Sequence, residues 1–194
     1  MKFAWVQNLS VRYNYSHDNV GPGFWTDLDS QNVLSDENEA SNNKLAGILH
    51  EISYTANITG NYIFDDGFIP QGSSLWYGAG ILISNSSNVT VQGNTVINCM
   101  NGIGGIMNNR GNNPSGQPHL LQDPNLKNNT ITQTTGVAAG IVVGGGYDNS
   151  VYTSWNNHFQ NNTFNLAYPA TYDYFFWLNQ PWTLAMWDIY SSIH

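Results

Sequence analysis

Hydrophobic positions recur along the chain in short alternating stretches. The unit is an aliphatic residue, two variable residues, an Asn, one variable residue and an aliphatic or aromatic residue, as in VQGNTV over residues 91–96. Such alternation is typical of β-strands with one buried face, and no intervening segment has the apolar period of a helix. The pattern therefore predicts a series of short strands whose Asn recurs at Asn14, Asn38, Asn61, Asn94, Asn129 and Asn162.

A Gly and a second alternating stretch follow the Asn in most units. GFWTDLDS begins at Gly23, GILHEISY at Gly47 and GILISNSS at Gly80. A unit of about 22–25 residues with several strands and no helix predicts a parallel β-solenoid, in which each coil stacks on the last. Inserted loops at residues 65–77 and 110–125 lengthen two of the units. Because an amide side chain both donates and accepts, the stacked Asn residues are expected to form a ladder that ties coil to coil.

These Val/Ile-x-x-Asn-x-Val/Ile units with their Gly-led strands resemble right-handed parallel β-helix repeat proteins, the group that includes pectate lyases and polygalacturonases. The resemblance covers nearly the whole chain. It implies an all-β fold, a right-handed parallel β-helix (solenoid) of about six coils, with residues 1–194 as one domain. It is poor evidence of activity, because the same fold serves lyases, hydrolases, epimerases, phage tailspikes and binding proteins.

The two ends of the solenoid are expected to differ. The segment QPWTLAMWDIYSS, residues 180–192, predicts a C-terminal capping helix with Thr183 as its N-cap and with Leu184 and Trp187 on the buried face. The N-terminal end opens inside a coil, without a recognisable cap. An uncapped coil end exposes strand edges, so self-association through this end is expected.

Aligning the strands by their leading Gly divides their residues between two faces. The mainly apolar face is expected to point inward, and its His50 is then expected to be a satisfied core histidine. The inward residues are Phe24, Thr26, Leu28, Ile48, His50, Ile52, Ile81 and Ile83. The other face is expected to form an outer strip of Trp25, Asp27, Asp29, Leu49, Glu51, Ser53, Leu82 and Ser84.

Asp27, Asp29 and Glu51 are the candidate catalytic carboxylates on this strip. Equivalent positions of adjacent coils lie ~4.8 Å apart, and Asp29 would lie roughly 6.6 Å along the strand from Asp27. Three ionised carboxylates so close need a compensating group. They fit the general acid and the partner carboxylate of a glycoside hydrolase. They also fit the oxygen ligands that Ca²⁺ prefers. In a lyase, such an ion would neutralise a uronate while an Arg or His removes a proton. A solvated strip without a ligand is the alternative.

Other residues are expected to border the same groove. His17 and Asp18 precede a Gly-Pro-Gly turn, and His17 is a candidate acid or base, although a His contacting only backbone fits equally well. Arg110 is a candidate clamp for an acidic sugar, or a partner of one of the acids. His119, in the loop SGQPHLLQD, could fold over the groove, although loop histidines are common. The aromatic candidates for stacking on sugar rings are Trp25, Trp76 and Tyr77, with packing in a core or lid as the alternative.

Composition and charge narrow the class of binding partner. Five Lys and Arg against 13 Asp and Glu give a net charge of −8, which excludes a nucleic-acid footprint and a polybasic membrane patch. The single cysteine, Cys99, excludes an intrachain disulfide. A surface made polar by uncharged side chains favours a polysaccharide or oligosaccharide, and hence an extracellular or periplasmic protein whose signal lies outside this chain. No cofactor is required, apart from Ca²⁺ in the cation hypotheses.

The leading hypothesis is a carbohydrate-active protein that binds and cleaves a polysaccharide at the acidic strip. Hydrolysis is preferred over β-elimination because acids outnumber plausible bases. A polysaccharide lyase is the first alternative, and a non-catalytic carbohydrate-binding or assembly module is the second.

Overall fold

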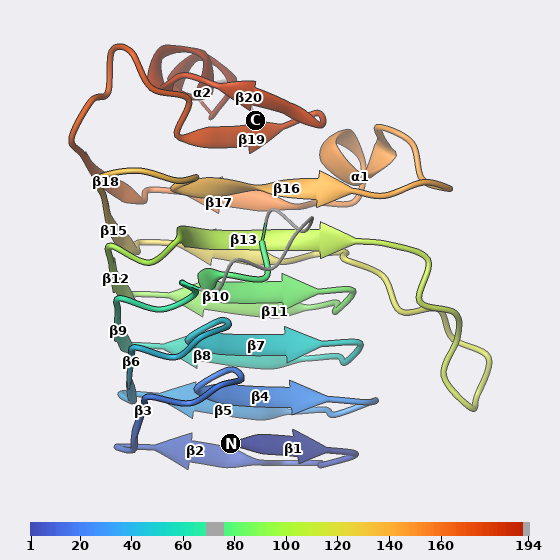
Figure 1. Cartoon of the computed structure of the whole chain (residues 1–194). Helices are drawn as coiled ribbons and strands as arrows, with labels where there is room; N and C mark the ends of the chain where they lie inside the picture. The colour runs from blue at the N-terminus through green and yellow to red at the C-terminus, as the bar shows by residue number, and fades with distance from the viewer. Residues whose placement is uncertain (69–75, 192–194) are drawn as a thin grey trace.

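The computed structural model describes residues 1–68 and 76–191, and it forms the parallel solenoid that the repeat predicts. Stacked coils run from the N-terminus at one end to the C-terminus at the other (Figure 1). Each regular coil contributes one strand to each of three sheets. Two of these sheets contain six strands, which agrees with the expected number of about six coils.

Sheet 1 carries the Gly-led strands and is parallel except for its last pair. Its strands, in spatial order, are β1 (Lys2–Ala4), β4 (Phe24–Asp27), β7 (Ile48–Glu51), β10 (Ala79–Ser84), β13 (Asn101–Met107), β16 (Ala139–Val143), β19 (Phe175–Trp177) and the antiparallel β20 (Gln180–Trp182).

Sheets 2 and 3 carry the two strands that flank each repeated Asn, and both are parallel throughout. Sheet 2 comprises β2 (Ser10–Arg12), β5 (Val33–Asp36), β8 (Ala56–Thr59), β11 (Val89–Gln92), β14 (Asn125–Lys127) and β17 (His158–Gln160). Sheet 3 comprises β3 (Tyr15–His17), β6 (Glu39–Ser41), β9 (Tyr62–Phe64), β12 (Thr95–Ile97), β15 (Thr130–Gln133) and β18 (Thr163–Leu166).

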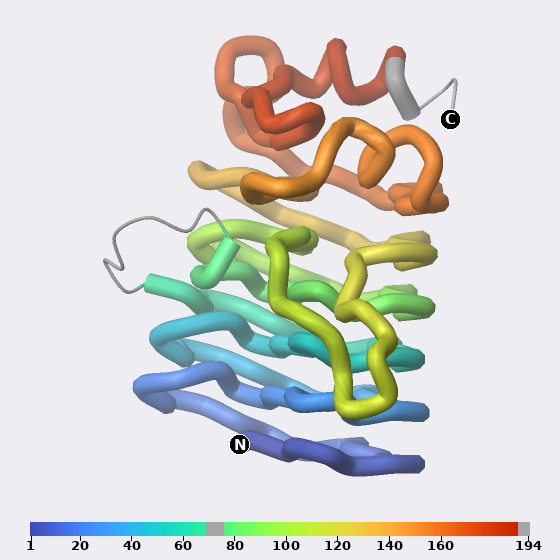
Figure 2. Tube along the Cα trace, turned by 90° about the vertical axis from the view of Figure 1, so that its right-hand side faces the viewer, coloured from blue at the N-terminus to red at the C-terminus, as the bar shows by residue number. Residues whose placement is uncertain are grey.

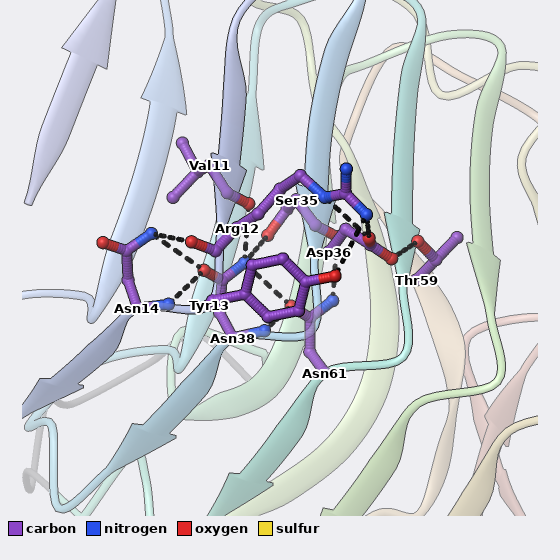
Figure 3. A network of polar contacts seen from close by, with 9 residues as sticks. All are labelled: Val11, Arg12, Tyr13, Asn14, Ser35, Asp36, Asn38, Thr59 and Asn61. Carbon is purple, nitrogen blue, oxygen red and sulfur yellow. Dashed lines mark hydrogen bonds and ion pairs between the residues drawn. The ribbon is translucent and has the colours of Figure 1, made fainter.

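The repeated Asn residues form the predicted amide ladder. Each of the first five donates its backbone N–H and its Nδ2 to the Oδ1 of the Asn in the next coil, as Asn38 does to Asn61 at 2.9 and 3.0 Å (Figure 3). The Nδ2 atom also reaches back, since that of Asn38 donates to the Val11 carbonyl at 2.8 Å. The same pattern continues through Asn94 and Asn129, so the ladder joins all six units.

A second, shorter ladder runs where sheet 3 turns into sheet 1. Asn19 donates its N–H and its Nδ2 to Oδ1 of Asn43, and Asn43 donates its N–H to Oδ1 of Asp66 at 2.6 Å. Asp66 is fully buried, and its Oδ2 has no hydrogen-bond partner. Burial is the main cause that raises its pKa to about 7. The ladder therefore ends on a carboxyl group where an amide would continue it.

The C-terminal cap is confirmed. Helix α2 (Leu184–Ser191) begins directly after Thr183, whose hydroxyl accepts a hydrogen bond from the Met186 N–H at 3.4 Å, as an N-cap does. Trp187 is buried and stacks on Phe175 with ring centroids 4.7 Å apart. The predicted helix from residue 180 starts later than expected, because β20 occupies its first residues, and Ser192 lies outside the described residues.

Two further features complete the architecture. A short helix, α1 (Ser150–Thr153), follows β16. At the N-terminal end β1, β2 and β3 are edge strands of their sheets in the described part of the chain, and self-association through them stays a prediction. Among the described residues, no helix combines the length and apolar character needed to cross a membrane.

Candidate functional site

Two of the candidate carboxylates lie side by side at the ends of neighbouring strands. In the register of β4 and β7, Thr26 is opposite His50, so the next residues, Asp27 and Glu51, are neighbours on the outward face. Both side chains are nevertheless buried, with 4% and 5% of the residue exposed. The strip predicted to be open is therefore covered.

Each of these carboxylates is held by a basic side chain. Lys2 lies 2.6 Å from Oδ2 of Asp27, and its ammonium group stands 3.5 Å from the centre of the Trp25 ring. Arg110 lies 2.7 Å from Oε1 of Glu51. Desolvation acts to lower the pKa of Arg110, but the hydrogen bond and charge of Glu51 outweigh it, so the pKa is raised. The paired cations compensate the charges that the sequence brings together.

Asp29 does not continue the strand, contrary to the expected spacing. β4 ends at Asp27, and Leu28 and Asp29 have φ angles of 52° and 57°, so the chain turns and the two-residue alternation fails. Oδ1 of Asp29 instead lies 2.7 Å from Nε2 of His119, a loop residue 90 positions later, whose side chain is buried. The Nδ1 atom of His119 lies 3.3 Å from the carbonyl of Gly111.

The loop over residues 108–124 makes these contacts. It leaves sheet 1 after β13 and descends beside the earlier coils, as the yellow-green tube in Figure 2 shows. In addition to Arg110 and His119, it supplies Asn113, which donates to the Tyr54 hydroxyl at 2.9 Å. The rings of Tyr54 and His119 lie 5.8 Å apart. Burial first, and then the charge of Asp29, raise the pKa of Tyr54.

A small apolar cluster covers the rest of the strip. Trp76 is completely buried, and its ring lies so close to Gly104 that a Cβ there would be 2.4 Å from it. Trp76 therefore packs as a lid residue, which is one of the two roles that the sequence allows. Trp25 and Tyr77 are partly buried against the same cluster of Ala46, Leu49, Trp76, Ala79, Leu82 and Ile106.

His17 and Asp18 lie elsewhere. They pair with each other at 2.6 Å, and both side chains are at least half exposed. Asp18 lies where the chain turns toward β4, whereas Asp29 lies in the turn that leaves it, so a strand of ~13 Å separates the two corners. The structure does not bring this pair to the other three carboxylates.

The described residues contain no group of three or more His, Cys, Asp or Glu side chains arranged to hold a metal ion. Asp27, Asp29 and Glu51 are each directed to a basic side chain instead. These carboxylates therefore offer no ready-made set of oxygen ligands for the Ca²⁺ that the sequence suggests.

His50 is the satisfied core histidine that the alternation predicts. It is buried, with Nε2 2.6 Å from the Tyr54 carbonyl and Nδ1 2.6 Å from the Thr26 hydroxyl. A carbonyl only accepts, so Nε2 carries the proton and Thr26 donates to Nδ1. Desolvation dominates and lowers the pKa of His50 to about 4, which keeps the ring neutral near pH 7.

The expected site residues do not include Lys2, Tyr54 or Asn113, and the sequence offers His119 only as a loop residue that could fold over the groove. Extending the alignment to the first strand would have found Lys2, because its register partner in β4 is Trp25. Nothing in the local sequence pattern points from the loop residues to Tyr54 or Asp29.

Comparison with known families agrees with this architecture. A family model described as a right-handed beta helix region matches residues 1–96. The chain is a right-handed parallel β-helix repeat protein. The comparison with curated proteins gives no match, and neither does the comparison with solved structures. The match supports the β-helix fold and assigns no activity.

Proposed function

We propose that this β-helix protein binds an acidic polysaccharide and cleaves it by β-elimination beneath the loop over residues 108–124. The observation that carries the proposal is the grouping of Tyr54 with the His119–Asp29 pair. Arg110, in the same loop, adds a cation. β-Elimination needs a cation to neutralise the uronate carboxylate, a base for the adjacent proton and an acid for the leaving oxygen.

Each group suits one of these roles. Arg110 is one-third exposed and offers a planar guanidinium to a carboxylate, with the half-exposed Lys2 as a second cation. Asp29 orients His119, whose second ring nitrogen is the candidate base once the contact with Gly111 is released. Tyr54 remains protonated because its pKa is raised, so it can donate to the leaving oxygen.

Hydrolysis by Asp27 and Glu51 is less favoured by this geometry. A general acid must carry a proton, and a carboxylate in a close ion pair with Lys or Arg is a poor proton donor. Both carboxylates are also buried, whereas Lys2 and Arg110 are partly exposed. Because His119 is buried, substrate entry requires the loop to move away from the coils. A polymeric substrate further supports an extracellular or periplasmic location.

The test is to incubate the protein with uronate polymers and to follow ultraviolet absorbance of unsaturated products together with new reducing ends. We expect both signals to rise together, and we expect His119→Ala and Tyr54→Phe to abolish them. His17→Ala is the matched control, because this His also pairs with an Asp but lies at another corner of the coil. Reducing ends without unsaturated products would refute elimination and return Asp27 and Glu51 to the catalytic role.

A further inference from the structure

The outward face of sheet 3 presents aromatic rings at its N-terminal end. In the strand register, Tyr15, Glu39 and Tyr62 form one row, and Tyr15 and Tyr62 are 56% and 45% exposed. The neighbouring row contains His17 and Phe64. We call the four ring-bearing residues Tyr15, His17, Tyr62 and Phe64 the aromatic face.

The rings form two pairs on this face. Tyr15 stacks on His17, with centroids 4.5 Å apart and ring planes inclined by 26°, and Tyr62 lies 5.4 Å from Phe64. The Tyr15 hydroxyl bonds to the Ser41 hydroxyl of the next coil at 2.9 Å, which holds the ring along the sheet. Tyr15 and Tyr62 are two strands apart, or roughly 9.6 Å. The rings thus come from β3 and β9, and the hydrogen bond to Ser41 holds the Tyr15 ring across β6 between them.

A polar pocket adjoins the aromatic face where sheet 3 turns toward sheet 1. Asp18, Asn42 and Asp65 occupy the equivalent turn position of three successive coils, each with φ near +55° (55°, 54° and 56°). They line a hollow of about 330 Å³ together with Lys44 and the exposed Phe68. We call this hollow, lined by Asp18, Asn42, Asn43, Lys44, Asp65 and Phe68, the corner pocket.

We propose that the aromatic face and the corner pocket together bind a neutral polysaccharide. Aromatic rings present a large rigid surface to the apolar face of a sugar ring at low entropic cost. Carboxylate and amide groups accept and donate to the sugar hydroxyls, and a few such polar groups fix the orientation of a ligand in a pocket.

Charge decides between neutral and acidic polymers. Asp18, Glu39 and Asp65 bring three negative charges to this surface against the single positive charge of Lys44. A polyuronate would be repelled here, whereas it is attracted by the cations of the proposed cleavage site. A protein partner with a dry apolar interface is disfavoured, because Glu39 and Ser41 interrupt the rings in the middle strand.

The inference does not depend on the proposed cleavage. Affinity electrophoresis in gels containing mixed-linkage glucan, xylan, galactomannan or polygalacturonate would test it. We expect at least one neutral polymer to retard the protein. Any retardation by polygalacturonate should be the same for Tyr62→Ala as for the wild type, because polygalacturonate should not bind this surface. Tyr62→Ala and Asp65→Asn should each weaken neutral-polymer binding about tenfold.

Two controls separate this result from other causes. Trp5→Ala removes an aromatic side chain that is 70% exposed but lies at a different corner, and it should leave binding unchanged. His119→Ala should also leave neutral-polymer binding unchanged, even if it abolishes cleavage. Circular dichroism melting checks that every variant is folded. Three results would overturn the inference: binding to none of the three neutral polymers, wild-type binding by both Tyr62→Ala and Asp65→Asn, or a loss of binding with Trp5→Ala as large as theirs.

Discussion

Replacing Asp66 by Asn should stabilise the protein at neutral pH but change its stability little near pH 4. Burial is the main cause that raises the folded-state pKa of Asp66 to about 7, whereas an unfolded Asp titrates near 3.8. The folded carboxyl group therefore binds its proton more tightly than the unfolded one. Stability is lost as the pH rises from about 4 to about 7, and three pKa units correspond to roughly 4 kcal/mol. An Asn would avoid this loss and supply the missing amide donor of the ladder.

His50 contributes the opposite slope in the same range of pH. Its folded-state pKa is about 4 and its unfolded value about 6.5, so its contribution is complete above about pH 6.5. It is lost as the pH falls to about 4, by roughly 3 kcal/mol. In the wild-type protein the two slopes partly cancel. In the Asp66→Asn variant the opposing slope of Asp66 is gone, so stability should rise between about pH 4 and pH 6.5.

Urea unfolding followed by tryptophan fluorescence at about pH 4, 5, 6, 7 and 8 measures the pH dependence of the free energy of unfolding. The quantity to plot is the free energy of unfolding of the variant minus that of the wild type, because the other titrating groups cancel in this difference. It should grow with pH up to about 7 and then level off. The exposed neighbour Asp65, whose φ of 56° also suits an Asn, provides the control Asp65→Asn. Its difference should vary much less with pH, because the charge of Asp65 is the smallest of the causes that act on the pKa of Asp66. A flat or falling difference for Asp66→Asn would refute the reasoning.

Three further substitutions test the ladder, the lid and the loop. Asn94→Ala strips two donors of their acceptor and should lower the free energy of unfolding in urea by about 2–4 kcal/mol, whereas exposed Asn57→Ala should cost about 0.5 kcal/mol or less; equal costs would contradict the ladder. Gly104→Ala forces a methyl group against the ring of Trp76 and should cost about 1–3 kcal/mol and shift the tryptophan emission, while unchanged emission would contradict the packing. His119→Ala removes the contact with Asp29 and should make proteolysis within the loop about tenfold faster in timed digests; an unchanged rate would show that this contact does not hold the loop.

The repeating features of the fold could be predicted because they depend on neighbours one coil apart. A strand that alternates buried and exposed positions repeats its environment in every coil. His50 was therefore correctly placed inside, and Asn94 was correctly placed in a ladder.

The cover of the outward strip could not be predicted in the same way. Asp29 meets His119 across 90 residues, and Trp76 packs on Gly104 from an inserted loop. Neither contact repeats from coil to coil, so no periodicity in the sequence predicts it. Alternation also gave the wrong position for Asp29, because it assumes a strand that in fact ends at Asp27. The face that a residue occupies follows from the repeat, but its exposure depends on segments that belong to no repeat.

The column of Asn amides has a consequence for how such proteins change length during evolution. Each amide bonds only to the coil on either side, although successive Asn residues are between 23 and 35 positions apart in the sequence. A duplication or deletion that begins and ends at equivalent Asn residues would preserve every bond on both sides of the junction. Loops between the rungs can meanwhile lengthen without disturbing the column. New binding surfaces can thus be acquired by insertion, while the column that keeps the coils in register stays the same.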